Sequence, residues 1–374
     1  MLVRLKTFLY LRRNSPNFFW RILFKVLKGI VDLTKINPNK KINNPLIIFI
    51  FKVFNYVPDF LYFIKLRFLR FFEPRSTSKK EKKIKIIEFY TLDTLNFFNR
   101  FTKVKNKWNN ITLTNSTYAD YYIVIDHPNN GLFKYYNPKK TIILQREPKE
   151  VRKEWGKWYI PDRKKFLHVH DIENNKMITE WYLDKTYDEL SNEDVKKTKD
   201  NVLSVIMSDN YVLPGHIKRI DLLENLDKES GLDIDIYGRA NIINSKIDKM
   251  VNYKGELPNL NKDVGMFPYK YHFNAENYVE KNYFTEKIID PILSETLCFY
   301  WGCPNIEEFI DPRAYIKIDI DNHEEAIRVI KESIKNNEWE KRIDIIRSEK
   351  KRILNEMQIM PMLEKIINES NSKN

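Results

Sequence analysis

Short apolar runs separated by polar segments dominate the chain from residue 81 onward. Runs of this length that are rich in Ile, Val, Tyr and Phe are typical of buried β-strands. The first series predicts strands at 85–90, 121–125, 141–145 and 166–170. These strands indicate a first α/β domain over residues 81–198, although the pattern locates its helices poorly.

A second series of strands and helices begins near Asn201. It predicts strands at 201–207, 233–237, 269–275, 297–301 and 315–318. Apolar residues follow helical periodicity at 216–226, from Thr285 onward, and at 323–336. We therefore expect a second α/β domain over residues 199–345 and a charged helical tail over 346–374.

Two α/β domains followed by a helical tail suggest the GT-B fold, in which two Rossmann-like domains face a cleft. In an open parallel sheet, ligands bind beside the carboxyl ends of the strands. Motifs that directly follow predicted strands are therefore the best candidates for a functional site.

The positive charge of the chain is concentrated before residue 81. Residues 1–80 hold 17 Lys and Arg against 3 Asp and Glu, whereas the rest of the chain holds 47 and 48. The body is thus nearly neutral, and its charge does not indicate nucleic-acid binding. We expect no nucleic-acid partner.

Residues 1–80 are also rich in apolar side chains, and residues 16–31 predict an amphipathic helix. In a second apolar stretch, Lys52, Asp59 and Lys65 interrupt the run, so no membrane-spanning helix is predicted. We expect a basic N-terminal arm that lies on a membrane surface. Packing of this arm on the body is the alternative, and the Golgi and the cytoplasmic face are both left open.

Several enzyme classes are not supported. The chain has no G-x-G-x-x-G, no G-x-x-x-x-G-K-[ST] and no G-x-S-x-G motif. Its two cysteines, Cys298 and Cys303, lie in an apolar stretch, make neither a disulfide framework nor a zinc site, and are expected to be reduced packing residues.

Acidic and histidine pairs that could bind a metal all alternate along strands. They are Asp233 and Asp235, Asp319 and Asp321, and His168 and His170. A period of two places polar residues on the solvent face of a strand, which explains these pairs without a metal. We expect no metal site and no obligatory metal cofactor.

The stretch 269–321 carries the strongest candidate chemistry. Glu276 and Asn277 follow a predicted strand, and Thr285 is a suitable N-cap for the helix that comes next. Free N–H groups and a partial positive charge at a helix N-terminus favour phosphate binding, and Lys287 adds a full charge there. Glu286 can accept hydrogen bonds from sugar hydroxyl groups.

This stretch resembles the donor-site signature of glycosyltransferase family 10, the α-1,3-fucosyltransferases. The matching segments, in order, are Tyr269-Lys270-Tyr271, Glu276-Asn277, Tyr283-Phe284-Thr285-Glu286-Lys287, Tyr300-Trp301-Gly302-Cys303-Pro304-Asn305 and Phe309-Ile310-Asp311-Pro312. Ser208-Asp209-Asn210, Gly215 to Arg219, and Asp235 to Arg239 also resemble family segments. Asp209, Tyr211 and Pro291 depart from the pattern, and Asp290-Pro291 is expected to kink or restart the helix.

The resemblance implies a donor-binding domain and the role of each matching residue. It implies that Arg219 and Lys287 bind the donor diphosphate and that Glu286 binds the ribose. The remaining members of the implied donor pocket are Asn277, Tyr283, Glu276 and Tyr237. The implied reaction is inverting transfer of fucose from GDP-fucose to a glycan acceptor without an obligatory metal.

Such a reaction needs a general base on the acceptor side. The best candidate is Glu147, which directly follows the predicted strand at 141–145. Partial desolvation would raise its pKa, and Arg146 would oppose that rise. Glu173 and Glu180 are weaker candidates, and Trp155, Trp158 and Trp181 are either an acceptor platform or core residues.

Two other interpretations remain open on the sequence alone. One is a GT-B transferase that uses a different nucleotide sugar, because fucose rests on the resemblance. The other is a protein that binds membranes or nucleic acid without catalysis.

Overall fold

The computed structural model describes residues 81–88, 94–116, 118–128, 131–173, 178–240 and 245–372. The basic arm predicted over residues 1–80 lies outside this part of the chain, so its place at a membrane stays a prediction. Among the described residues, no helix has both the length and the apolar character that crossing a bilayer requires.

The first sheet has the strand order β2-β3-β1-β4-β5-β6. Its strands are β1 (Lys82–Glu88), β2 (Lys107–Trp108), β3 (Ile111–Leu113), β4 (Tyr121–Ile125), β5 (Thr141–Leu144) and β6 (His168–His170). All pairings are parallel except that of β2 with β3. The central strands β4 and β5 are almost continuously apolar and buried, as expected when both faces of a parallel sheet are covered.

Within the described residues, short helices connect these strands and link β6 to the second sheet. They are α4 (Thr94–Asn99), α5 (Lys149–Arg152), α6 (Tyr187–Asn192) and the 3₁₀ turns Gly131–Tyr135, Pro138–Lys140 and Lys153–Trp158. Helices of four to six residues are too short to show an amphipathic period, which explains why the sequence did not place them.

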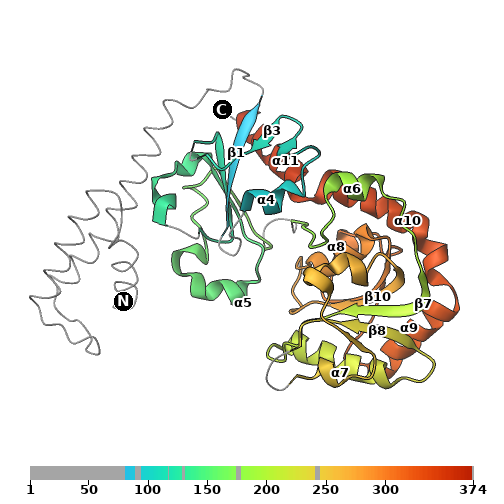
Figure 1. Ribbon diagram of the computed structural model, residues 1–374. Coiled ribbons are helices and arrows are strands. Elements are labelled where there is room, and N and C mark those ends of the chain that lie inside the picture. Colours follow the sequence, from blue (N-terminus) through green and yellow to red (C-terminus); the bar gives the residue numbers. More distant parts are fainter. Residues whose placement is uncertain are drawn as a thin grey trace, which may run out of the picture. The chain divides into compact units, whose positions relative to one another are not determined.

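The second sheet is wholly parallel, with the strand order β12-β11-β10-β7-β8-β9. Its strands are β7 (Lys199–Ile206), β8 (Asp233–Tyr237), β9 (Tyr253–Gly255), β10 (Tyr269–Ala275), β11 (Leu297–Trp301) and β12 (Tyr315–Lys317). This is the doubly wound Rossmann order, in which the direction of winding reverses between β7 and β10. Figure 1 shows α7 (Pro214–Lys228) and α8 (Glu286–Leu293) on opposite sides of these strands.

The C-terminal helices connect the two sheets. After α9 (His323–Lys335), α10 (Glu338–Arg352) leads through the π-helical turn Ile353–Met357 to α11 (Ile359–Ser372), which lies beside β3 (Figure 1). The indole Nε1 of Trp108 donates to Glu364 at 3.1 Å, and the buried Gln358 amide donates to the Phe101 carbonyl at 3.1 Å. The helical tail predicted over 346–374 therefore packs on the first domain.

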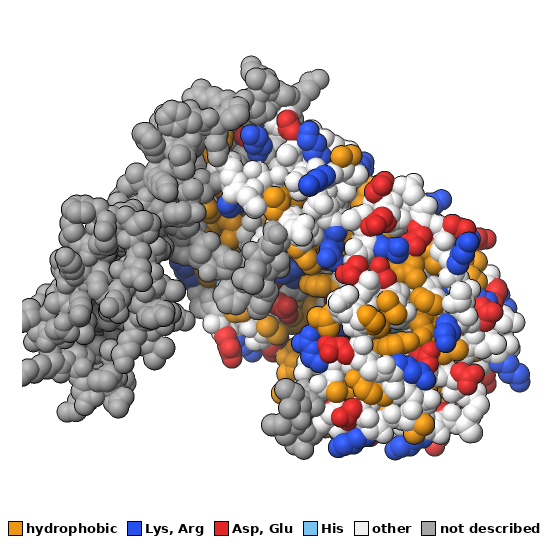
Figure 2. Space-filling view, viewed as in Figure 1, with side chains coloured by type: hydrophobic (Ala, Val, Ile, Leu, Met, Phe, Trp, Pro, Cys, Tyr) orange, Lys and Arg blue, Asp and Glu red, His pale blue; other side chains and the backbone are white. Residues whose placement is uncertain are grey.

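The two-sheet α/β architecture that the apolar runs predicted is confirmed. Strands β2, β3 and β9 were not predicted, because each is only two or three residues long. On the face shown in Figure 2, Lys and Arg side chains are interspersed with Asp and Glu over the second domain.

Candidate active site

The N-terminus of α7 is pressed against the loop that follows β10. A Cβ atom added to Gly215, in the first turn of α7, would lie 2.4 Å from the carbonyl oxygen of Asn277. No residue larger than glycine fits at that distance without movement of the backbone. This close approach brings Arg219, one turn further along α7, to the carboxyl ends of β7 and β10, where the sheet reverses its winding.

Arg219 is a buried cation at this switch point. Its Nη1 donates to Asn277 Oδ1 at 2.7 Å and to the Ala275 carbonyl at 3.4 Å, and its Nη2 donates to Ser208 Oγ at 3.2 Å. Its Nε is buried and has no hydrogen-bond partner. Burial lowers the pKa of Arg219 to about 10, although Glu276 and Glu286 oppose this shift. A buried guanidinium with no salt-bridged carboxylate is well suited to an anionic ligand.

The N-terminus of α8 is held by Glu276, which has no exposed surface. The Thr285 N–H and Oγ1 both donate to the Glu276 carboxylate at 2.8 Å, and the Tyr300 hydroxyl donates to it at 3.3 Å. Thr285 in turn caps the helix by accepting from the Lys287 N–H, as its sequence position predicted. In this geometry Glu276, predicted as a substrate-binding residue, positions the cap of α8.

Lys287 and Glu286 form the first turn of α8. The Lys287 Nζ lies 3.3 Å from Glu286 Oε1 and 3.5 Å from Glu276 Oε2. Burial lowers the pKa of Lys287, but the two carboxylates outweigh it and the net pKa is raised. Burial acts to raise the pKa of Glu286, yet Lys287 and Lys262 bring it down to about 2. Glu286 is therefore ionised near neutral pH and accepts hydrogen bonds without donating any.

Helix α8 does not restart at Asp290, and that expectation was wrong. The helix runs from Glu286 to Leu293 with Pro291 inside it. Pro291 cannot donate to the carbonyl four residues earlier, and the Cys298 thiol lies 3.8 Å from that oxygen, which belongs to Lys287. Both cysteines are buried and free, as predicted. The Asp290 carboxylate accepts from the Tyr182 N–H at 2.9 Å and from Lys262 Nζ at 3.0 Å.

Two further predicted donor-site residues lie in different surroundings. Tyr283 is 4% exposed, and burial raises the pKa of its hydroxyl, with Glu276 and Glu147 contributing. The Tyr237 hydroxyl instead bonds to the Tyr269 hydroxyl at 2.8 Å, and Tyr269 donates to Asp235 at 2.8 Å. Among the described residues, this tyrosine pair shares no hydrogen bond with Arg219 or Lys287.

Glu147 follows β5 in the first domain and is half-buried. Its pKa is raised, first by burial and then by the negative charge of Asp126. The positive charges of Arg146 and Lys287 lower the pKa and partly oppose this rise. The directions match the prediction that burial raises the pKa and Arg146 opposes the rise. Because the charge of Lys287 acts on Glu147, the carboxyl lies within electrostatic range of the donor-side cation.

The rival carboxylates are engaged by arginines. Glu180 accepts from Arg146 at 2.6 Å, and Arg146 also binds Asp126 at 2.9 Å. Glu173 pairs with Arg152. A carboxylate that is ion-paired to a guanidinium is a weaker base than an unpaired one, so the geometry favours Glu147.

Comparison with known proteins places this geometry in a family. Residues 196–342 match the family model described as glycosyltransferase family 10 (fucosyltransferase), C-terminal. This part of the chain is similar to the C-terminal domain of that family. The matched residues include Arg219, Asn277, Glu286 and Lys287.

Three known proteins are similar to parts of this chain. An α-(1,3)-fucosyltransferase of Helicobacter pylori is 38% identical over 72 residues, which are 19% of this chain and 15% of that protein. A crystal structure of an α1,3-fucosyltransferase with GDP-fucose is 16% identical, with a TM-score of 0.45, 77% of this chain covered and 94% of that chain. An α-glucosyltransferase in complex with UDP and DNA gives a TM-score of 0.51 at 11% identity, covering 78% and 99%. The fold is the GT-B fold that the two α/β domains predicted.

The aromatic candidates on the acceptor side divide into two kinds. Trp181 has no exposed surface, packs 4.4 Å from Phe101 between ring centroids, and donates to the Lys185 carbonyl. It is a core residue. Trp155 and Trp158 are half-buried on the 3₁₀ turn after α5, where they can present a ring face to a ligand.

One carboxylate of each acidic pair forms an ion pair with lysine. Asp235 lies 3.6 Å from Lys199 and 3.4 Å from Lys254, and Asp321 pairs with Lys218 at 2.6 Å. In the described part of the chain, no three His, Cys, Asp or Glu side chains converge as a metal site would require. Whether the reaction of this protein needs a metal stays a prediction.

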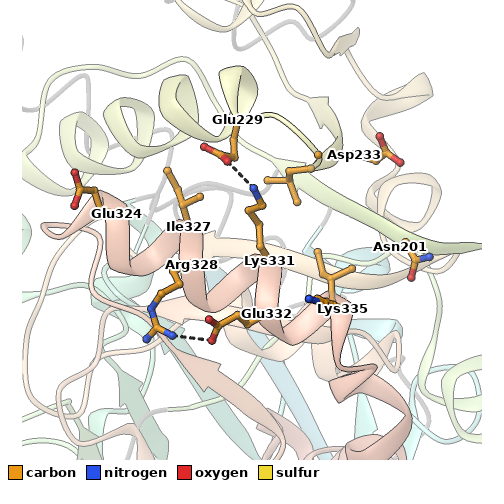
Figure 3. A pocket seen from close by; sticks show the side chains of 12 residues that line it. Asn201, Glu229, Asp233, Glu324, Ile327, Arg328, Lys331, Glu332 and Lys335 are labelled. Atoms are coloured by element: carbon orange, nitrogen blue, oxygen red, sulfur yellow. Dashed lines mark hydrogen bonds and ion pairs between the residues drawn. The ribbon is translucent and has the colours of Figure 1, made fainter.

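A hollow of about 740 Å³ has neither Arg219 nor Lys287 in its lining. It is lined by α9 and by the turn between α7 and β8, and its charges pair with one another (Figure 3). Lys331 contacts Glu229 at 2.6 Å and Arg328 contacts Glu332 at 2.7 Å. The hollow shares none of the predicted site residues.

Sequence reasoning missed Lys262, Asp290 and Arg152. Arg152 is 2% exposed and donates to the Glu147 carbonyl at 2.9 Å and to Gln145 Oε1 at 2.6 Å. It thereby fixes the backbone of the candidate base. A charged residue at the end of a four-residue helix gives no sequence signal for burial.

Proposed function

We propose that this glycosyltransferase transfers fucose from GDP-fucose to a hydroxyl group of a glycan acceptor, with inversion at the anomeric carbon. The observation that carries the proposal is the pair of cations Arg219 and Lys287 at two neighbouring strand ends of a family 10 domain. The family match and the relatives named for fucose transfer support the choice of donor.

The diphosphate of the donor binds between Arg219 and the first turn of α8. Arg219 offers a buried Nε without a partner, and the N-terminus of α8 adds its partial positive charge next to Lys287. Both cations stabilise the negative charge that develops on the departing GDP, a role that a divalent metal has in other transferases. We therefore propose that no metal is obligatory.

The nucleoside binds beside the same helix turn. The ionised Glu286 accepts hydrogen bonds from the ribose hydroxyl groups, and Asn277 and Tyr283 line the pocket. Asn277 is already oriented by its hydrogen bond from Arg219 at 2.7 Å. Glu276 supports the pocket through Thr285 and Lys287.

The acceptor reacts on the side of Glu147. Glu147 removes the proton of the acceptor hydroxyl. At the same time the acceptor oxygen attacks the anomeric carbon, and the bond between that carbon and the GDP oxygen breaks. A raised pKa makes Glu147 a stronger base, although the charge of Lys287 opposes part of that rise. The basic arm over 1–80 holds the enzyme at a membrane surface, where its acceptor glycan is presented.

A thermal-shift panel of nucleotides on the full-length protein tests the donor assignment. GDP should raise the melting temperature more than UDP or ADP does. At ten times its dissociation constant a ligand adds about 1.4 kcal/mol of stability. A larger shift with UDP would refute GDP-fucose as the donor and support a transferase for another nucleotide sugar.

A further inference from the structure

A lysine behind the donor site bridges two carboxylates of α8. Lys262 begins the 3₁₀ turn Lys262–Gly265, which Asn261 caps by accepting from the Asp263 N–H at 2.8 Å. Its Nζ lies 3.0 Å from Asp290 Oδ2 and 3.7 Å from Glu286 Oε1. Nothing in the family signature discussed above includes this lysine.

The two carboxylates need a cation between them. Glu286 and Asp290 are four residues apart on one helix, so they face the same side and repel each other. Asp290 is fully buried, and Glu286 is only 21% exposed in its side chain. Burial lowers the pKa of Lys262, but the two carboxylates outweigh it and keep the ammonium charged.

Lys262 is one of three cations that lie close to three carboxylates near the N-terminus of α8. The carboxylates are Glu276, Glu286 and Asp290, and the cations are Arg219, Lys287 and Lys262. Without Lys262 this cluster would lose a positive charge where a diphosphate has to bind. Glu286 would then keep only Lys287, which the diphosphate itself requires.

Lys262 is held in place from the connection between the two domains. The Tyr182 N–H donates to Asp290 Oδ1, the other oxygen of the carboxylate that binds Lys262. The Lys262 ammonium also lies 5.4 Å from the centroid of the Tyr182 ring. The lysine is thus fixed by contacts that do not involve the donor.

We propose that Lys262 is a positioning residue that holds the Glu286 carboxylate in place for the ribose hydroxyl groups of the donor. The proposal rests on the proposed function, in which Glu286 binds the ribose. Lys262 leaves Lys287 available for the diphosphate, because it supplies the second cation that Glu286 and Asp290 need.

The test compares GDP with 2′,3′-dideoxy-GDP by calorimetric titration of full-length variants. In the parent protein, loss of the two hydroxyl groups should weaken binding about tenfold or more, as expected for hydrogen bonds to a charged group. Glu286→Gln should remove most of this difference. Asp290→Asn, which leaves Lys262 beside Glu286, should retain it, and so should Lys262→Arg.

The decisive variant is the double substitution Asp290→Asn with Lys262→Met. It removes one charge of each sign, so it leaves no buried aspartate unpaired and should fold. We expect its GDP to dideoxy-GDP ratio to fall to that of Glu286→Gln. Lys331→Met, which breaks an ion pair with Glu229 remote from α8, is the control and should keep the parent ratio.

Two results separate failure of this inference from failure of the proposed function. If the double variant keeps the ratio of Asp290→Asn, Lys262 does not position Glu286. The inference would also be overturned if Asp290→Asn alone lowered the GDP to dideoxy-GDP affinity ratio while Lys262→Met alone kept the parent ratio. If the parent protein does not bind GDP, the proposed donor site itself is wrong.

Discussion

Replacement of Arg219 by Met should weaken GDP binding strongly and change the stability of the free protein little. The side chain is 4% exposed, and burial lowers its pKa from the ordinary value of an arginine to about 10. Because a pKa change of one corresponds to about 1.4 kcal/mol, burial destabilises the charged guanidinium in the free protein by about 3 kcal/mol relative to water. Three hydrogen bonds, at about 1 kcal/mol each, offset about the same amount.

The free energy of unfolding of Arg219→Met should therefore lie within about 1–2 kcal/mol of the parent value. Binding of GDP should instead lose at least one charged hydrogen bond, worth about 1.5–3 kcal/mol, which corresponds to a loss of about tenfold or more in affinity. Urea denaturation and calorimetric titration with GDP measure the two quantities on the same protein.

Arg152→Met is the matched control, because Arg152 is 2% exposed but has a carboxylate partner in Glu173. Its loss leaves Gln145 Oε1 and two carbonyl groups without a donor, so we expect a destabilisation of about 2–4 kcal/mol. If Arg219→Met is as destabilising as Arg152→Met and still binds GDP like the parent, Arg219 is a structural residue and the reasoning fails.

Further predictions concern the reaction itself. Glu147→Gln should lower kcat by about 10²–10⁴-fold and leave GDP affinity nearly unchanged; near-normal turnover would reject this base. Because the base must be deprotonated and its pKa is raised, the rate in kcat/KM profiles should fall with decreasing pH around a midpoint above 4.5, and a midpoint below that value would contradict the raised pKa. Lys287→Ala should weaken GDP binding in titrations about tenfold or more, and unchanged affinity would contradict its role. Turnover should persist in EDTA; complete loss with rescue by manganese would point to Asp233 and Asp235, or to Asp319 and Asp321.

The second domain could be predicted in detail from the sequence because each of its long strands is a distinct apolar run. The helix start at Thr285 was also predictable, since the capping residue and the charged first turn follow a standard pattern. Pro291 was misjudged because the helix tolerates it, with the Cys298 thiol near the carbonyl that it leaves without a donor. That compensation comes from β11, which is not adjacent in sequence.

The residues that hold the candidate site in place could not be predicted either, because their partners are also distant in sequence. Lys262 and Asp290 are 28 residues apart and meet only because a 3₁₀ turn packs beside α8. Glu276 was read as a ligand-binding residue, yet its full burial and its bonds to Thr285 depend on the packing of β10 against α8. Sequence patterns selected candidate site residues, and tertiary packing determines which of the candidates contact one another.

The most direct test of the central claim is a nucleotide-release assay on the full-length protein with a panel of sugar nucleotides and glycan acceptors. We predict acceptor-dependent release of GDP from GDP-fucose. Faster acceptor-dependent release from a uridine or adenine sugar nucleotide, with no release from GDP-fucose, would contradict the account.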